Sequence, residues 1–476
     1  MHEPDSSEPP SQRLAVVVLA AGQGTRMRSH LPKVLHPVAG RPMLGHVLEM
    51  VARLGALQAV VVTSHLAGDL RPVLGEIPSV EQAEQLGTAH AVVQARSQLE
   101  GKSDVVLVVY GDTPLLRHET AARLLATLRG ATLAVLTVEL DDPTGYGRVV
   151  RDSATGALQR VVEERDADES LRQIREVNSG VMAFDASWLW AHVGDLPAHD
   201  NGEYYLPDLV ERALAEGKTI ATLTTDEPAE ALGVNTQAEL ARANQLAWRR
   251  NVARLMDEGV VVLDPATTYV ESNVTVKAGT VIHPATHLQS RERPTRIGRD
   301  CVIGPSTTIV DSQIGDRSSV VYSVVEASLV DEDVQIGPFS HLRPGCHLES
   351  GVCFGNYAEA KNSRIRRDTQ VHHFSYLGDA DVGERVNIGA GTITCNYDGQ
   401  AKHRTTIGND VFVGSDSMLV APIELGEASR TGAGSVVTHD VPSGTTVLGV
   451  PARQYRPRSE SAETDGGVAP EQRQGA

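Results

Sequence analysis

The sequence is poor in aromatic residues and cysteines. Only 4% of its 476 residues are Phe, Trp or Tyr, and its four cysteines include no CxxC pair. A dense disulfide framework of the secreted type is therefore excluded, and we expect reduced thiols in a cytoplasm. With so few rings available, the core must be built mainly from aliphatic side chains.

Positive charge and long apolar runs are also scarce. Lys and Arg total 43 against 61 Asp and Glu, which gives a formal charge of −18. This excess of negative charge argues against a general affinity for nucleic acid or for an anionic membrane surface. No run approaches the roughly 18 apolar residues that span a bilayer, and the apolar segment 14–21 follows an acidic, proline-rich stretch rather than the basic one of a signal peptide. We expect a cytoplasmic protein with no nucleic-acid or membrane partner.

The length predicts two or three domains. Over 1–237, short apolar runs such as LAVVVLA and VVLVVY alternate with amphipathic helical stretches. This alternation predicts an α/β domain, and residues 238–258 have the composition of one linker helix. The polar, Pro- and Gly-containing ends, 1–13 and from about 458, are expected to be disordered tails.

A six-residue repeat replaces the helical period in the segment 259–476. Apolar or small residues recur at this spacing at Ile407, Val413, Leu419, Leu425, Thr431 and Val437. The spacing is typical of hexapeptide β-helices. A polar segment at 391–406 interrupts the repeat, so we expect an insertion there that offers functional side chains.

The segment LAAGQGTRM at 19–27 directly follows the first predicted strand. Its two glycines permit close backbone approach to a phosphate, but Met27 stands where a dinucleotide fingerprint has a third Gly, and no GK[ST] ending follows. Lys33, seven residues beyond Arg26, supplies a second cation. The two side chains are either ordinary surface charges or a pair that neutralises a triphosphate.

With the following LPKVLH, this segment resembles the sugar-1-phosphate nucleotidyltransferase family. The resemblance extends through QAEQLGTA, YGD, TGYGR, VVEERDA, VNSG and LGVN, which occur in the same order. It implies a Rossmann-like mixed sheet, charge neutralisation by Lys33 and Arg26, and a Mg²⁺ ion held by Asp112 and Asn235. The UTP and UDP-sugar site that it implies comprises Leu19, Ala20, Ala21, Gly22, Lys33, Gln82, Gly87, Thr88, Tyr110, Gly111, Asp112, Gly147, Glu163, Asn178 and Asn235.

Two groups of polar residues stand out in the repeat region. His341, His347 and Cys353 are six residues apart, and if three hexads close one coil they lie on different faces and cannot share a metal ion. Arg343 and Lys361 are 18 residues apart, so they should stack about 5 Å apart on successive coils. Two stacked cations are either solvated charges or a phosphate site.

The dipeptide His372-His373 lies in HHFSYLG. Neighbouring residues of a strand point to opposite faces, so we expect only one of the two rings to face a cleft. An imidazole with a near-neutral pKa suits proton transfer, whereas a lone histidine is more often structural.

Together with LRPG, NYAEAK, NIGAGT and CNYDG, this segment resembles the bifunctional N-acetylglucosamine-1-phosphate uridyltransferase / glucosamine-1-phosphate acetyltransferase family, over about residues 14–450. The resemblance implies a left-handed parallel β-helix, a homotrimer and His373 as general base. It implies a glucosamine 1-phosphate site made by Arg343, Lys361, Tyr376 and Asn387, and an acetyl-CoA site made by Ala390, Asn396, Tyr397, Ser415, Ala433 and Arg453. Val450 replaces an arginine of the family, for which Arg453 is the nearest substitute.

The sequence therefore predicts a bifunctional enzyme of cell-envelope precursor synthesis. It acetylates glucosamine 1-phosphate with acetyl-CoA and then couples the product to UTP with release of pyrophosphate, giving UDP-N-acetylglucosamine. Two alternatives remain at this stage. One is a sugar nucleotidyltransferase whose β-helix only trimerises or regulates, and the other is a scaffold without turnover.

Overall fold

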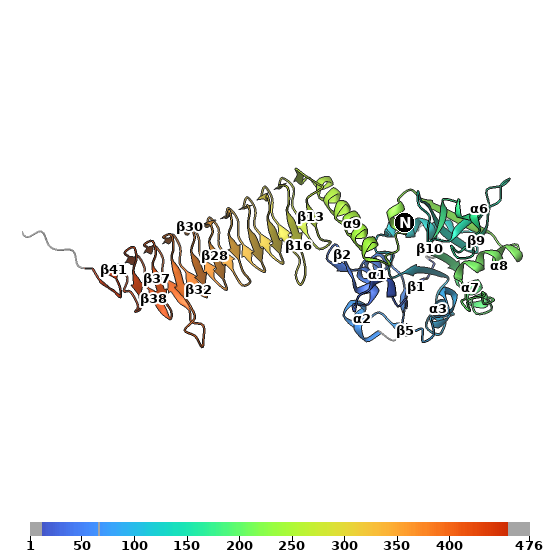
Figure 1. Cartoon of the computed structure of the whole chain (residues 1–476), viewed down its shortest axis with the longest axis horizontal. Coiled ribbons are helices and arrows are strands. Elements are labelled where there is room, and N and C mark those ends of the chain that lie inside the picture. Colours follow the sequence, from blue (N-terminus) through green and yellow to red (C-terminus); the bar gives the residue numbers. More distant parts are fainter. Residues whose placement is uncertain (1–11, 65–66, 456–476) are drawn as a thin grey trace, which may run out of the picture. The chain divides into compact units, whose positions relative to one another are not determined.

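The computed structural model describes residues 12–64 and 67–455 (Figure 1). The chain divides into two compact units, Met1–Arg254 with Tyr269–Asn273, and Leu255–Thr268 with Val274–Ala476. Most of the expected disordered tails lies outside the described residues. Arg13, however, is ordered, because its guanidinium pairs with Asp104 at 2.8 Å. Among the described residues, every helix is too short or too polar to cross a membrane.

The first unit is built on one mixed sheet in the order β11-β7-β10-β6-β1-β4-β5. Strands β1, β4, β5 and β6 are parallel, whereas β10 runs antiparallel to both β6 and β7. The hairpin β8–β9 joins β10 at its side. The strands are β1 (Leu14–Ala20), β4 (Gln58–Thr63), β5 (Ser79–Glu81), β6 (Val105–Tyr110), β7 (Leu133–Glu139), β8 (Arg148–Arg151), β9 (Leu158–Val162), β10 (Glu176–Asp185) and β11 (Ile220–Thr225). The predicted mixed α/β sheet is confirmed.

Alternating aliphatic side chains of β1 enter two different cores. Val17 and Leu19 pack on one face of the sheet, and Val16 and Val18 pack on the other. Both faces are thus buried, as the continuous apolar run LAVVVLA requires. One face is covered by α1 (Met43–Arg53), α2 (Ala67–Leu74) and α5 (His118–Thr127), and the other by α3 (Thr88–Gln94), α7 (Ala186–His192) and α8 (Leu209–Ala215).

Short elements and one long helix complete the first unit. The short ones are η1 (Thr25–Met27), η2 (Lys33–Leu35), β2 (Pro37–Val38), β3 (Arg41–Pro42), α4 (Arg96–Leu99), α6 (Glu169–Arg172), η3 (Leu206–Asp208) and η4 (Pro228–Ala231). The long helix, α9, is continuous over Gln237–Asp257, and its Ala243 and Ala247 pack on Met27, Met43 and other residues of the first unit.

The second unit is a left-handed parallel β-helix, as predicted. Over most of the unit every third strand joins the same sheet, so three sheets run along it, from β12 (Val261–Val262), β14 (Thr275–Val276) and β16 (His287–Gln289) onward. The strands that carry or precede candidate residues are β25 (His341–Leu342), β27 (Cys353–Asn356), β28 (Glu359–Lys361), β30 (Gln370–His373), β31 (Tyr376–Gly378), β33 (Asn387–Ile388), β34 (Ile393–Cys395), β36 (Phe412–Val413), β39 (Arg430–Thr431), β41 (Thr446–Gly449) and β42 (Ala452–Gln454).

The six-residue repeat marks the interior of this helix. Each of the six repeat positions from 407 to 437 is at most 3% exposed. The expected insertion at 391–406 is smaller than predicted, because Ile393–Cys395 form β34 and pair with the next coil. Only the segment after Cys395 leaves the coil, held together by a bridge between Tyr397 and Lys402.

Candidate active sites

A cavity of about 350 Å³ lies at the carboxyl ends of β1 and β6. The two strands are parallel neighbours, with Leu19 opposite Tyr110, so the loops that follow them meet at the same edge of the sheet. The predicted site residues that line this cavity are Leu19, Ala20, Ala21, Gly22, Lys33, Gln82, Gly87, Thr88, Tyr110, Asp112 and Asn235.

Lys33 lies between the two predicted metal ligands. Its ammonium donates hydrogen bonds to the carboxylate of Asp112 and to the amide oxygen of Asn235, the latter at 3.1 Å. The Lys33 and Asp112 side chains are only 11% and 15% exposed. The positions of Asp112 and Asn235 are coupled as well, because Val234 N–H donates to the Asp112 carbonyl at 3.0 Å. The Lys33 charge is thus already held by two oxygen atoms of the kind that bind hard metal ions.

The glycine-rich loop permits this approach of Lys33. Gly24 has a φ of +64°, and a Cβ there would lie 2.6 Å from the Lys33 Cβ. Gly111 joins the loop after β6 to β1, since its N–H donates to the Leu19 carbonyl at 2.9 Å. Arg26, on η1, is exposed and does not line the cavity. The structure therefore brings Lys33 into the site and leaves the Arg26 side chain in solvent.

The glutamine-rich segment forms the opposite wall. Gln82 is 4% exposed, and its amide donates to the Gly87 carbonyl at 3.0 Å. Gln85 donates to the Ala21 carbonyl at 3.0 Å, which joins this wall to the loop after β1. Thr88 accepts a hydrogen bond from the backbone of Leu206.

Gly147, Glu163 and Asn178 form a separate group that does not line the 350 Å³ cavity. A Cβ on Gly147 would lie 3.4 Å from a Glu163 carboxylate oxygen, and Asn178 N–H donates to the Gly147 carbonyl at 2.8 Å. Tyr110 connects the group to the cavity: burial, followed by the charges of Glu163 and Asp112, raises the pKa of its phenol. Burial likewise raises the pKa of Glu163.

In the β-helix, His373 belongs to a column of residues on successive coils. Asn356 is its partner in the register, and the Asn356 amide oxygen lies 3.3 Å from His373 Nδ1. Gln370 is opposite Asn387 on the next coil, so His373, three residues after Gln370, is aligned with Ala390. The pairs Asn387–Phe412 and Phe412–Arg430 align Ser415 and Ala433 with it in the same way on the two following coils. Four residues predicted from the sequence therefore fall on one line, together with Asn356.

Both His372 and His373 are exposed in the single chain, and β30 ends at His373. That only one of the two rings faces a cleft stays a prediction. They differ in their neighbours, since His372 Nδ1 lies 3.5 Å from the Cys353 thiol. Among the described residues, no group of three or more His, Cys, Asp or Glu is arranged to hold a metal ion.

A second column carries positive charge. Arg343 N–H donates to the Ala360 carbonyl, which aligns Arg343 with Lys361 on the next coil as predicted. Arg343 also donates to Glu359 at 3.1 Å. The ammonium of Lys402 is the largest cause that lowers the pKa of Lys361, and Arg343 adds to the effect. Three cations therefore gather at this face of the β-helix.

The remaining candidates lie around and beyond these columns. Gly378 gives room to its neighbours, since a Cβ there would overlap the Tyr376 hydroxyl and lie 2.7 Å from the Asn396 amide nitrogen. Asn396 donates to Asp379 at 2.6 Å, while Tyr397 is 61% exposed. Arg453, on β42, lines a cavity of about 360 Å³ with residues of the final coils.

Sequence reasoning missed several neighbours of these sites. Gln85 and Glu203 line the 350 Å³ cavity at the ends of β1 and β6, Lys402 joins the cation column, and Asn356 contacts His373. Asn356 stands 17 residues before His373, one short of three hexads, so a count of regular 18-residue coils would have pointed to Gly355 instead. Lys402 lies in the loop, where no repeat predicts its position.

Comparison with known proteins agrees with the division of the chain into two units. Residues 16–177 match the MobA-like NTP transferase domain, and residues 404–439 match the hexapeptide repeat of succinyl-transferase. The chain is 45% identical to the bifunctional protein GlmU of Pelobacter propionicus over 445 residues, which cover 92% of the chain and 96% of the relative. It is 45% identical to that of Halalkalibacterium halodurans, covering 91% and 95% of the two chains, and 43% identical to that of Listeria monocytogenes serotype 4a, covering 91% and 94%.

Proposed function

The chain belongs to the family of bifunctional GlmU proteins, and on that premise we propose how its two units divide the work of a uridylyltransferase and acetyltransferase that makes UDP-N-acetylglucosamine. The first unit transfers the uridylyl group, and the second transfers the acetyl group. The observation that carries this assignment is the Lys33 ammonium held between Asp112 and Asn235 inside the nucleotide cavity.

In the first unit, the residues position two phosphate compounds for an in-line exchange. The phosphate oxygen of N-acetylglucosamine 1-phosphate attacks the α-phosphorus of UTP, and pyrophosphate leaves. The attacking oxygen is already ionised, so no general base is required. Lys33 neutralises charge on the phosphates, and Arg26 turns from solvent toward the triphosphate. Gln82, Gly87 and Thr88 hold the base, while Gly147, Glu163 and Asn178 hold the sugar.

Asp112 and Asn235 fit a Mg²⁺ ion. A carboxylate and an amide oxygen are hard ligands, and the Lys33 ammonium held by both supports a position that favours a cation. When bound, Mg²⁺ neutralises phosphate charge. Asp112 then no longer needs Lys33 as its counter-charge, and the Lys33 ammonium can bind the phosphates instead.

In the second unit, His373 takes a proton from the amine of glucosamine 1-phosphate, and the amine attacks the thioester carbon of acetyl-CoA. The carbon–sulfur bond breaks and the coenzyme A thiolate leaves. The Asn356 amide oxygen orients the ring through Nδ1, which directs Nε2 toward substrate. Arg343, Lys361, Tyr376 and Asn387 hold the amino-sugar phosphate.

Acetyl-CoA lies along the column of His373 and the segment after it. The residues assigned to it are Ala390, Asn396, Tyr397, Ser415, Ala433 and Arg453. Burial raises the pKa of the Cys395 thiol, which keeps it protonated at neutral pH and supports direct transfer rather than an acyl-cysteine intermediate.

Assembly and location complete the proposal. Hexapeptide β-helices favour oligomerisation, and we assign a homotrimer. The four cysteines are free, which fits a reducing compartment, and we assign the cytoplasm.

The experiment supplies glucosamine 1-phosphate, acetyl-CoA, UTP and Mg²⁺, and follows free thiol and pyrophosphate as separate signals. Both signals are expected. Pyrophosphate only from added N-acetylglucosamine 1-phosphate, without thiol release, would leave the β-helix as a scaffold and contradict the second assignment.

A further inference from the structure

The long helix α9 begins directly after one of the two predicted metal ligands, Asn235. The sequence TQAE at 236–239 has the S/T-x-x-E spacing of a capping box. The structure forms both of its hydrogen bonds: Thr236 N–H donates to the Glu239 carboxylate at 2.8 Å, and Glu239 N–H donates to the Thr236 hydroxyl at 3.2 Å. Asn235 is therefore the last residue before a well-defined helix N-terminus.

Glu239 also makes a hydrogen bond that a capping box does not require. Its Oε2, which binds Thr236 N–H, accepts from Asn235 N–H as well, at 2.7 Å. Asn235 precedes the N-cap residue, so its N–H is not one of those that a helix N-terminus leaves unsatisfied. The additional bond fixes the backbone of Asn235 rather than the end of the helix.

The residue before Asn235 is fixed too. Val234 N–H donates to the Asp112 carbonyl at 3.0 Å, and the Val234 side chain is fully buried in the core cluster to which α9 contributes. Two consecutive N–H groups thus have acceptors. Asn235 itself is only half-buried, so the backbone bonds direct its amide oxygen toward Lys33 Nζ, 3.1 Å away.

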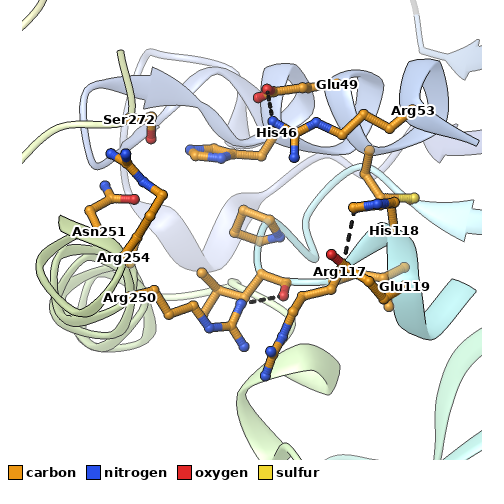
Figure 2. A pocket seen from close by; sticks show the side chains of 15 residues that line it. His46, Glu49, Arg53, Arg117, His118, Glu119, Arg250, Asn251, Arg254 and Ser272 are labelled. Atoms are coloured by element: carbon orange, nitrogen blue, oxygen red, sulfur yellow. Dashed lines mark hydrogen bonds and ion pairs between the residues drawn. The ribbon is translucent and has the colours of Figure 1, made fainter. Parts of the chain in front are cut away.

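Helix α9 gives Glu239 a firm support. The amide of Gln237 donates to the Met27 carbonyl at 3.0 Å, at the end of the glycine-rich segment. Further along the helix, Arg250 Nη1 donates to the Leu115 carbonyl at 2.6 Å, beside a cavity of about 340 Å³ lined by α1, α5 and α9 (Figure 2). The helix is thus bonded to the segments that follow β1 and β6, which also form the nucleotide cavity.

We propose that Glu239 is a positioning residue for uridylyl transfer: its carboxylate fixes the Asn235 backbone and so holds the Asn235 amide oxygen at the cation position beside Asp112. The inference rests on the proposed function of the first unit, in which Asp112 and Asn235 hold Mg²⁺. Glu239 does not line the 350 Å³ cavity, so it acts through Asn235. Without this acceptor, Asn235 N–H turns to water, and one of the two protein ligands leaves the cation position.

The test measures metal binding directly. Mn²⁺ is the probe, and electron paramagnetic resonance follows its free concentration on the full chain with saturating UDP-N-acetylglucosamine, so that no turnover occurs. Glu239→Ala is expected to raise the Kd for Mn²⁺ about tenfold, a loss typical for a partner that orients a metal ligand. Glu239→Gln keeps an oxygen acceptor at the same reach and should stay within about twofold of wild type.

Two further variants separate reach, charge and capping. Glu239→Asp keeps the charge but shortens the side chain by one methylene, so it should weaken Mn²⁺ binding even if Glu239→Ala does not fold. Thr236→Ala removes the hydroxyl half of the capping box, so it should lower the Tm and leave Mn²⁺ binding unchanged. The Mg²⁺ concentration for half-maximal uridylyl transfer should follow the Kd for Mn²⁺ across these variants, while acetyl transfer is unchanged.

The outcomes distinguish the inference from the function on which it rests. Unchanged Mn²⁺ binding in Glu239→Ala or Glu239→Asp, a loss in Glu239→Gln as large as that in Glu239→Ala, or an equal loss in Thr236→Ala would overturn the role of Glu239 alone. Asp112→Asn should weaken Mn²⁺ binding at least as much as Glu239→Ala does. Binding that survives in Asp112→Asn would instead contradict the metal site of the proposed function, and with it the role of Glu239.

Discussion

The guanidinium of Arg148 is 2% exposed and lies 2.7 Å from the carboxylate of Glu164. Glu164 also accepts a hydrogen bond from the Gly145 backbone at 3.1 Å. This pair therefore ties the segment that carries Gly147 to the segment that carries Glu163. We expect it to position the proposed sugar site.

Replacing Glu164 should destabilise the first unit. Glu164→Ala leaves the Arg148 charge buried without its carboxylate, which costs about 3 kcal/mol in the free energy of unfolding. We also expect a higher KM for N-acetylglucosamine 1-phosphate with little change in the KM for UTP. Urea unfolding and steady-state kinetics measure both, with exposed Glu169→Ala as the control. Equal rises in both KM values would contradict a role confined to the sugar site.

Removing the Lys33 charge should affect only one of the two reactions. Lys33→Ala loses phosphate neutralisation, so uridylyl transfer should fall about 10²- to 10³-fold, while acetyl transfer persists. Arg28→Ala, exposed on the same loop, serves as the control. Loss of both activities together would point to misfolding or a wrong assignment of Lys33.

The two adjacent histidines offer a matched comparison in the second unit. His373→Ala should lower acetyl transfer about 10²- to 10⁴-fold, the range expected for loss of a general base. His372→Ala, at a residue that is also exposed on the same strand, should retain most activity. Thiol release from acetyl-CoA measures both. Comparable losses in the two variants would show that the site depends on local structure rather than on the His373 base.

Acid should destabilise the first unit through His46. Its pKa is about 4 in the folded state, mainly because of burial, against about 6.5 when unfolded. As pH falls from 6.5 to 4, the imidazole is protonated in the unfolded chain but stays neutral in the folded one. The free energy of unfolding therefore falls by up to about 3 kcal/mol. His46→Gln should lose less Tm between pH 7 and pH 4.5 than wild type does. The exposed His30→Gln should lose as much as wild type. Identical losses in all three proteins would exclude His46 as the cause.

The repeat and the sheet were predictable because their patterns are local. A side chain every six residues must point inward once three hexads close a coil, and the buried side chains keep that spacing from Ile407 to Val437. Earlier coils shorten it, since Ile309 and Ile314 are five residues apart. The run LAVVVLA likewise predicts a strand that is buried on both faces, as β1 is.

The remainder depends on contacts distant in sequence. Arg148 is a charged residue in the core, and only the fold reveals that Glu164 balances it. Tyr110 joins two groups of site residues that no spacing relates. Lys402 reaches the cation column from a loop without a repeat, so its place follows from the loop's path alone.

The column that contains His373 also sets a length. Asn356 and Ala433 are four coils apart, and coils stack about 4.8 Å from one another, so the column extends about 19 Å. Since three of the proposed acetyl-CoA residues lie in this column, we expect the length of the acyl donor to decide how many coils it contacts. A truncated thioester would meet Ala390 beside the base but end short of Ala433, whereas a full-length donor would contact every coil between them.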